Sequence, residues 1–561
     1  MRQLTALDAQ FLDVECATTA AHVAGLAILD PADGSVSLEA LADLLRERIH
    51  LSPALTHRLA PVPLGLDRPY WVAEPAPDID DHLFETVLPA PGDRRQLTDE
   101  VALIHARHLD RTRPLWEMHL IRGLADGLVA VYTKVHHAAI DGVSGAETLA
   151  ALLDLTPIPR HPAPPPTSSG HQRETPADTA SAGLGELCSR MVGGRPAAER
   201  LTTGIAADRP AAGTDELVDA PAAGTGELVD APAAGAGELV DAPAAGTDER
   251  GGGLPGWGGM LLGAVVRSAT YPVRAAAAAV RAAGDLDAIP LACAIPGAGL
   301  IAKAARTVTR DPHRRPELPR LAAPRTPLNG PISGGRHLAI GSVPLKDVRK
   351  VARAHGVSVN DVVMTLCTTA LRSWLAERDA LPDEPLVVAV PVAVRKGAAG
   401  ETVGNQISAM VAPLPTNVAD PVERLRRMGA TMRAAKRRFA LAPAGWLGDL
   451  CSLLPAPVTT LATPAIFRLA SVAFPPINLI ISNVPGPQFP LYLCGGRVLS
   501  YYPLSVLTDL TGGVNITCFS YDGMLDFGVV ACPERMDDVW GLLGHLQRAL
   551  DELPDEEDVG G

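Results

Sequence analysis

Apolar and polar residues along the first 160 positions follow two periods, one typical of strands and one typical of helices. Residues 129–135 are rich in β-branched side chains and predict a strand. Ser144 and Glu147 have capping-box spacing before an apolar-periodic run, so a turn and a helix should follow. Other expected elements are strands near 70–72, 84–88 and 118–121, and helices over 38–49 and 99–109, the latter with Thr98 as N-cap. The first unit is therefore predicted to be mixed α/β.

The same two periods return after residue 326. A helix should begin at Ser358, because apolar residues recur in steps of three and four from 362 to 375. Asp522 and Gly523 between two apolar runs predict a hairpin that joins strands over 514–520 and 524–530. Other expected elements are strands over 336–343, 385–395 and from 477, and helices over 420–439, with Asp420 as N-cap, and over 537–550. A second α/β unit is therefore predicted over 326–553, after a first over 1–160.

The segment between the two units differs in kind. An eleven-residue repeat begins at 210 (PAAGTDELVDA) and returns at 221 and 232. Every copy contains proline and glycine and has few apolar residues to bury, so residues 161–253 are expected to be a disordered acidic linker without a catalytic role. A helical crossover connector is expected over 254–325, and an acidic tail over 554–561.

Composition limits the possible partners. The chain of 561 residues has a formal net charge of −14, which argues against nucleic acid. Eight cysteines without a CxxC motif fit a reducing compartment, and early acidic residues argue against a signal peptide. The apolar windows 260–266 and 461–481 are short or broken, so no spanning helix is expected. Peripheral attachment to lipid stays open, with the apolar stretch 441–474 as a membrane-facing or lid region. Basic residues in 302–325 and 420–439 form either solvated faces or contacts to anionic groups.

Two adjacent histidines, His136 and His137, end the strand predicted over 129–135. Neighbouring strand residues point to opposite faces, so only one of the two can easily face a substrate. A neutral imidazole can take a proton from a hydroxyl and return it to a leaving group. A buried packing role is an alternative, and a metal site is a third, disfavoured because adjacent strand histidines diverge. Asp141, in the tight turn that Gly142 permits, could orient a ring or pair with an arginine.

Further polar candidates occur at the ends of other predicted elements. Arg395 ends an apolar strand and requires a carboxylate, for which Asp141 is the expected partner. Asn360 and Asp361 lie in the first turn of a helix, where they either cap it or contribute to a site. Trp116, in the sequence Pro-Leu-Trp, is expected to fill the core one hairpin before the histidines.

The string HHAAIDG at 136–142 resembles the HHxxxDG signature of the CoA-dependent acyltransferase superfamily, which includes chloramphenicol acetyltransferase and peptide-synthetase condensation domains. The full set of motifs resembles the bacterial wax ester synthase/diacylglycerol acyltransferase family. These motifs are LTALDAQFL at 4–12, PLW at 114–116, HHAAIDG, SVND at 358–361, VPVAVR at 390–395 with GNQ at 404–406, and ISNVPGP at 481–487. The resemblance covers both folded units and omits the repeat segment.

The resemblance implies an α/β (α+β) fold of two chloramphenicol-acetyltransferase-like halves around a central tunnel. Acyl-CoA, a substrate and not a cofactor, would enter from one side, and diacylglycerol or a long-chain fatty alcohol from the other. His137 would be the general base and Asp141 mainly structural, with His136 and Gly142 beside them and no metal or acyl-enzyme. Asn360 would lie near the oxyanion. The remaining candidates for substrate-binding or supporting roles are Asp361, Arg395, Asn405, Trp116 and Asn483.

The expected location is the cytoplasm, with peripheral association with the inner membrane or lipid inclusions. Two other functions stay open: an acyltransferase of the same superfamily for a polyketide diol or a carrier-bound amine, and a non-catalytic lipid-binding or lipid-droplet protein. The intact HHAAIDG string argues against the second of these. The sequence determines neither the preferred acceptor and acyl chain length nor the oligomeric state.

Overall fold

The computed structural model describes residues 2–161, 257–284, 298–309, 322–393, 407–441 and 451–554, apart from short gaps at 32–35, 75, 141, 452–453 and 474. Residues 162–253 of the predicted linker, residues 555–561 of the predicted tail and parts of the predicted connector over 254–325 lie outside these residues. So do three candidate site residues: Asp141, Arg395 and Asn405.

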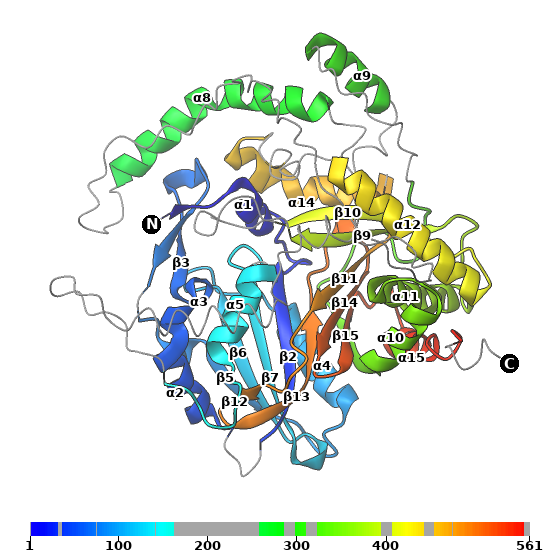
Figure 1. Ribbon diagram of the computed structural model, residues 1–561. Helices are drawn as coiled ribbons and strands as arrows, with labels where there is room; N and C mark the ends of the chain where they lie inside the picture. Colours follow the sequence, from blue (N-terminus) through cyan, green and yellow to red (C-terminus); the bar gives the residue numbers. More distant parts are fainter. Residues whose placement is uncertain are drawn as a thin grey trace, which may run out of the picture.

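Figure 1 shows the first of two six-stranded sheets, in which His136 is the last residue of one inner strand and His137 follows it directly. Its strands in spatial order are β12 (Tyr492–Leu493), β13 (Gly496–Leu504), β2 (His22–Asp30), β7 (Val129–His136), β6 (Trp116–Arg122) and β5 (Leu83–Val87). Helices α2 (Leu38–Arg48) and α5 (Gly142–Leu152) pack on one face, and α4 (Arg94–Ala106) packs on the other. Strand β7 runs antiparallel to β2, which places His22 opposite His136. A small separate sheet has the order β1 (Arg2–Gln3), β4 (Tyr70–Ala73) and β3 (His57–Ala60).

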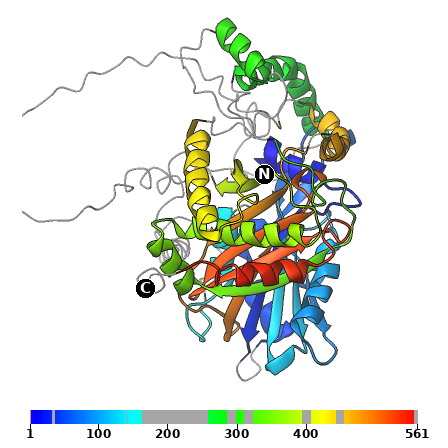
Figure 2. The same cartoon turned by 90° about the vertical axis from the view of Figure 1, so that its right-hand side faces the viewer.

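The second sheet carries its own helical layer. Its strands in spatial order are β10 (Ile407–Leu414), β9 (Leu386–Ala393), β11 (Leu479–Pro485), β14 (Val514–Tyr521), β15 (Met524–Ala531) and β8 (His337–Pro344). The helices whose apolar faces share the core of this half are α10 (Leu345–Ala354), α11 (Val359–Ala376), α12 (Pro421–Leu441) and α15 (Val539–Arg548). Figure 2 shows this layer from its outer side. The mixed α/β fold expected for both halves is thus confirmed.

The two halves share a sheet and a core. Strands β12 and β13 come from the second half of the chain but complete the first sheet, so the sequence boundaries of the two predicted units are not those of the sheets. An apolar cluster that includes Tyr132, Leu338 and Leu504 joins the halves. Gly528 of β15 lies so close to β13 that a Cβ atom there would be 1.9 Å from the Pro503 carbonyl oxygen. Only glycine therefore permits this approach of the two sheets.

Three helices lie outside both sheets: α8 (Trp257–Gly284), α9 (Ala298–Thr309) and α14 (Ala456–Ala473). In Figures 1 and 2, α8 and α9 lie together at the top of the molecule, above the segment that carries the N-terminus. Helix α14 has a mean hydropathy of 1.2 over 18 residues and, by length and composition alone, could cross a membrane. This differs from the expectation of no such helix. Pro475 and Pro476 follow the end of α14 and so do not interrupt it.

Most helix starts agree with the sequence signals, and two do not. Ser358 caps α11 in a capping box with Asp361, and Asp522 and Gly523 form the two-residue turn between β14 and β15. Helix α4, however, begins at Arg94, capped by a box of Asp93 and Gln96. The N-cap prediction for Thr98 was therefore wrong, because the earlier box already satisfies the free amides. Helix α5 begins at Gly142, two residues before the predicted cap.

Candidate active site

The two histidines lie where β7 ends and the chain turns toward α5. His136 is the last residue of the strand and is 1% exposed, whereas His137 is only partly buried. The Ala139 amide donates to the His136 carbonyl oxygen at 2.9 Å, which closes the turn. His136 therefore belongs to the interior, and His137 is the more accessible of the two residues.

The tautomer of His136 follows from its neighbours. The Ala138 backbone amide donates to Nδ1 at 3.0 Å, and Nε2 lies 3.3 Å from Oε1 of Glu15. A backbone N–H can only donate, so Nδ1 must be an unprotonated acceptor. The single ring proton is therefore on Nε2, where it faces a carboxylate.

Glu15 is a buried charge directly after helix α1 (Ala6–Asp13). Its side chain is 5% exposed. Oε1 accepts the Ala21 amide at 2.9 Å, and Oε2 accepts Nη2 of Arg111 at 2.6 Å. Burial by itself raises the pKa of Glu15, but the contacts with His136, Ala21 and Arg111 outweigh it and lower the pKa to about 2. Glu15 is thus a carboxylate at neutral pH.

Residues 11–21, at the end of α1 and in the loop after it, also hold His137. The His137 amide donates to the Ala21 carbonyl oxygen at 2.9 Å, so the residue whose amide binds Glu15 also fixes the His137 backbone. The ring of Phe11, on α1, stacks on the His137 imidazole with centroids 3.9 Å apart and planes 7° apart. This stacking restricts the rotation of the imidazole. Both histidines are therefore placed by one short N-terminal segment.

The sheet face beside His136 is unusually polar. Lys134, fully buried, lies 3.0 Å from Glu117 and donates to the carbonyl oxygens of Ile104 and Arg107 near the end of α4. Burial lowers the pKa of His105 to about 3 and keeps the pKa of His22 well below its usual value. These two histidines are therefore neutral at pH 7.

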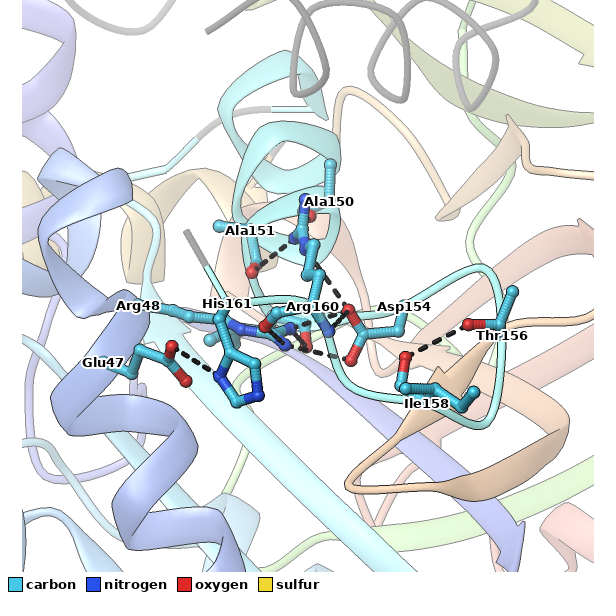
Figure 3. A network of polar contacts seen from close by, with 10 residues as sticks. Glu47, Arg48, Ala150, Ala151, Asp154, Thr156, Ile158, Arg160 and His161 are labelled. Atoms are coloured by element: carbon cyan, nitrogen blue, oxygen red, sulfur yellow. Dashed lines mark hydrogen bonds and ion pairs between the residues drawn. The ribbon is translucent and has the colours of Figure 1, made fainter. Parts of the chain in front are cut away.

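A buried ionic network fixes the far end of α5 (Figure 3). Arg48 lies 3.0 Å from Asp154 and donates to the Leu152 carbonyl oxygen at 3.1 Å. Arg160 donates to the carbonyl oxygens of Ala150 and Ala151. Two guanidinium groups thus satisfy the last carbonyls of α5 and oppose the negative end of its dipole.

Asp154 links the same network to the second half of the chain. Its backbone exchanges two hydrogen bonds with Tyr492 of β12, at 2.8 and 2.9 Å. The helix that starts immediately after Asp141 is therefore anchored at its other end by residues from α2, the 154–160 loop and β12.

Two of the predicted site residues of the second half are brought together. The side-chain amide of Asn483, on β11, donates to Oδ1 of Asn360 at 3.1 Å. Asp361 accepts the Ser358 amide at 3.0 Å, so the capping interpretation of this residue is confirmed. The placement of Asn360 near an oxyanion stays a prediction.

Trp116 fills the core and does not join the histidines. It is 1% exposed, donates from Nε1 to the Leu55 carbonyl oxygen at 2.9 Å, and stacks on His82. It lies in the cluster on the other face of the first sheet from His136, so its packing interpretation is confirmed. Gly142 is the first residue of α5, and the proposed pair of Asp141 with Arg395 lies outside the described residues.

Sequence reasoning missed the residues that hold the two histidines. Glu15 was noted only as an argument against a signal peptide, and Phe11 only as part of the LTALDAQFL string. The only sequence signal for them was that the LTALDAQFL string is followed closely by the carboxylate of Glu15. In the part of the chain that the structure describes, no group of three or more histidine, cysteine or acidic residues could hold a metal ion.

The fold and the motif together define a class. Two mixed α/β halves share a sheet, and the first residue of HHAAIDG, His136, ends an inner strand of that sheet, in keeping with the class that the motif indicates. The model of the wax ester synthase/diacylglycerol acyltransferase catalytic domain matches residues 4–223 and 267–363, and that of its C-terminal domain matches 403–554. The chain therefore belongs to the wax ester synthase/diacylglycerol acyltransferase family and is an acyltransferase.

Individual relatives agree with this assignment. A putative diacylglycerol O-acyltransferase of Mycobacterium tuberculosis is 31% identical, over 99% of this chain and 90% of its own length. A probable diacylglycerol O-acyltransferase of the same organism is 30% identical, over 99% of this chain and 98% of its own length. Among solved structures, the wax ester synthase/diacylglycerol acyltransferase from Marinobacter aquaeolei matches over 100% of both chains with a TM-score of 0.59 and 26% identity.

Proposed function

We propose that this protein transfers a long-chain acyl group from acyl-CoA to the free hydroxyl of diacylglycerol, forming triacylglycerol, and that it also accepts long-chain fatty alcohols to form wax esters. Family membership supports the reaction class. The observation that carries the chemistry is the position of His137, a partly exposed imidazole at a strand end, held in place by its backbone and by a stacked ring.

In the proposed reaction, His137 accepts the hydroxyl proton as the oxygen attacks the thioester carbonyl carbon. A C–O bond forms, the C–S bond then breaks, and the imidazolium returns the proton to the CoA thiolate. The products are an ester and CoA with a free thiol, without an acyl-enzyme, a cofactor or a metal. A general base typically contributes about 10² to 10⁴ in rate, so alignment of the two substrates must contribute much of the remainder.

Asn360 is the proposed polar group for the oxyanion. Because Asn483 donates to its Oδ1 atom, the side-chain amide of Asn360 is held with its NH₂ group as the donor. A donor fixed before reaction stabilises developing negative charge more effectively than a mobile one. Asn360→Ala should therefore lower kcat more than it changes the KM for acyl-CoA.

Release of CoA tests the proposal. Purified protein is given palmitoyl-CoA with diolein or hexadecanol, and the free thiol is measured with a thiol reagent. His137→Ala should abolish release while its circular dichroism stays that of the wild type, and His161→Ala, at an exposed histidine, should remain active. If His137→Ala keeps most of the activity, the base assignment is wrong. If the wild type releases no CoA with any alcohol, the proposed reaction fails and a lipid-binding role is favoured.

We further propose that the protein lies on the cytoplasmic side of the inner membrane or on lipid inclusions, attached peripherally through α8, α9 and α14. These helices expose large apolar side chains, among them Leu262 (66% exposed), Leu300 (76%) and Leu461 (83%). Such a surface is typical of helices that lie in a lipid interface. It would also give apolar acceptors direct access to the enzyme.

Helix α14 is oriented for this role. Thr460 and Thr463 bond to Asp13 and Gln10 of α1, so the polar side of α14 faces the protein while Leu461 and Leu469 face outward. Helix α1 also carries Phe11, the ring stacked on His137. Flotation with phosphatidylcholine/phosphatidylglycerol vesicles should recover the wild type, and Leu461→Asp with Leu469→Asp should reduce recovery. Equal recovery of both proteins would contradict attachment through α14.

A further inference from the structure

Glu15 is buried and charged, and the reaction proposed above does not use it. Removing a carboxylate from water is costly unless it is paired and hydrogen-bonded. A loop that needed only an acceptor for the Ala21 amide could use an uncharged side chain. Here the carboxylate instead faces Nε2 of His136 and a guanidinium group of Arg111.

We propose that Glu15 is the positioning residue of the histidine pair. Through Nε2 of His136 it selects one tautomer of that ring, and through Ala21 it fixes the backbone of His137. The inference rests on the proposed function, since it assigns to Glu15 a role in the action of the base.

A short chain of hydrogen bonds links Glu15 to the backbone of His137. Oε1 of Glu15 accepts the Ala21 amide at 2.9 Å, and the carbonyl oxygen of Ala21 accepts the His137 amide at 2.9 Å. The Ala138 amide donates to His136 Nδ1 and prevents protonation there, so the His136 ring can present a proton only to Glu15. Movement of Glu15 would therefore release both histidines.

The charge of Glu15 also acts on proton transfer. When His137 accepts the hydroxyl proton, a positive charge develops on the residue next to His136. A buried anion beside that pair stabilises the imidazolium, because charges interact strongly where water is excluded. Removal of the Glu15 charge should therefore make His137 a weaker base.

Other charged and titratable groups face the pair from the surrounding elements, and the experiment must separate their effects. His22 is opposite His136 on β2, Lys134 precedes it on β7, and Arg111 binds Glu15 from the loop after α4. The remaining groups among the described residues are Asp13 at the end of α1, His105 and Arg107 near the end of α4, His108, and Glu117 on β6. Glu15 differs from these in contacting both His136 and the residue that holds His137.

The test is the pH dependence of kcat/KM with palmitoyl-CoA and diolein. Activity requires neutral His137, so the acid limb reports the pKa of the base. Glu15→Gln should lower kcat about 10- to 100-fold with little change in KM for acyl-CoA, as expected when a group that orients a catalytic histidine is lost. Its acid limb should move to lower pH by about 0.5 to 1 unit, because the base loses a nearby negative charge.

Three further variants make the test independent of folding defects in Glu15→Gln. Arg111→Gln removes the opposing positive charge at a side chain that is 46% exposed, and its acid limb should move to higher pH. Asp154→Asn removes another buried, arginine-paired carboxylate, so it should lower the melting temperature and leave the limb in place. Glu15→Asp, which retains the charge, should keep the limb near that of the wild type.

The results distinguish failure of the positioning role from failure of the proposed function. Limb shifts of opposite sign in Glu15→Gln and Arg111→Gln support the positioning role. Wild-type kcat in folded Glu15→Gln would overturn it, and so would an unmoved limb in both variants. Failure of the wild type to release CoA at any pH would instead overturn the proposed function.

Discussion

Loss of the Arg48–Asp154 ion pair should severely destabilise the protein. The two side chains are 1% and 3% exposed and 3.0 Å apart. Removal of one member of a buried pair typically costs about 3–5 kcal/mol, because the other charge remains buried. In Arg48→Met, Asp154 keeps Arg160 as a guanidinium partner at 3.2 Å. Loss of the ion pair should therefore cost about 3 kcal/mol of stability, the lower end of that range. The Leu152 carbonyl oxygen also loses a donor, at about 1 kcal/mol. We therefore expect Arg48→Met to lower the free energy of unfolding by about 4 kcal/mol.

Urea unfolding followed by circular dichroism measures this loss. Arg46→Met is a matched control on the same helix, because Arg46 pairs with Asp43 at 2.9 Å but both side chains are more than half exposed. An exposed pair of this kind should contribute less than about 1 kcal/mol. A double-mutant cycle with Asp154→Leu then isolates the direct coupling. If Arg48→Met lies within about 1 kcal/mol of the wild type, the network does not anchor α5 as argued.

Three further predictions follow from single residues. Gly528→Ala should lower the free energy of unfolding by about 1–3 kcal/mol, since the new Cβ would overlap the Pro503 carbonyl oxygen; an unchanged urea midpoint would contradict the close approach of β15 to β13. Burial raises the pKa of Asp526 from 3.8 to about 6. The unfolded chain therefore loses this proton at lower pH than the folded protein, so the free energy of unfolding falls as pH rises from 3.8 to 6, by about 3 kcal/mol in total. Asp526→Asn should therefore gain melting temperature relative to the wild type at pH 7 but not at pH 4. Phe11→Ala should lower kcat about 10-fold, because the His137 imidazole loses its stacked ring, whereas the KM for acyl-CoA should change less. An unchanged kcat would show that the stacking is not needed.

Elements with strong local signals could be predicted from the sequence. The hairpin turn at Asp522-Gly523 needs positive φ at both residues, and the structure has φ values of 41° and 81° there. The helix after Ser358 was predicted for a similar reason, since its cap and apolar stripe are both local. Helix α4 was placed five residues late because the Asp93–Gln96 box lies before its apolar stripe begins, and that box went unrecognised.

Pairing between distant segments could not be predicted in the same way. Strand β13 pairs with β2 although about 470 residues separate them, and its sequence does not indicate which sheet it joins. The same distinction between local and distant signals applies to the site residues. His137 carries a motif and was identified, whereas Glu15 and Arg111 acquire their roles only when the end of α1 meets the end of β7.

The central claim is that the His137 imidazole is the general base for a direct transfer from acyl-CoA to an alcohol. The most direct measurement is the single-turnover rate of ester formation by His137→Ala at saturating palmitoyl-CoA and diolein, compared with the wild type. The account predicts a fall of about 10² to 10⁴ in this rate with the fold intact. A fall of less than about 10-fold would contradict it, because a general base at the reacting hydroxyl cannot be lost at so small a cost.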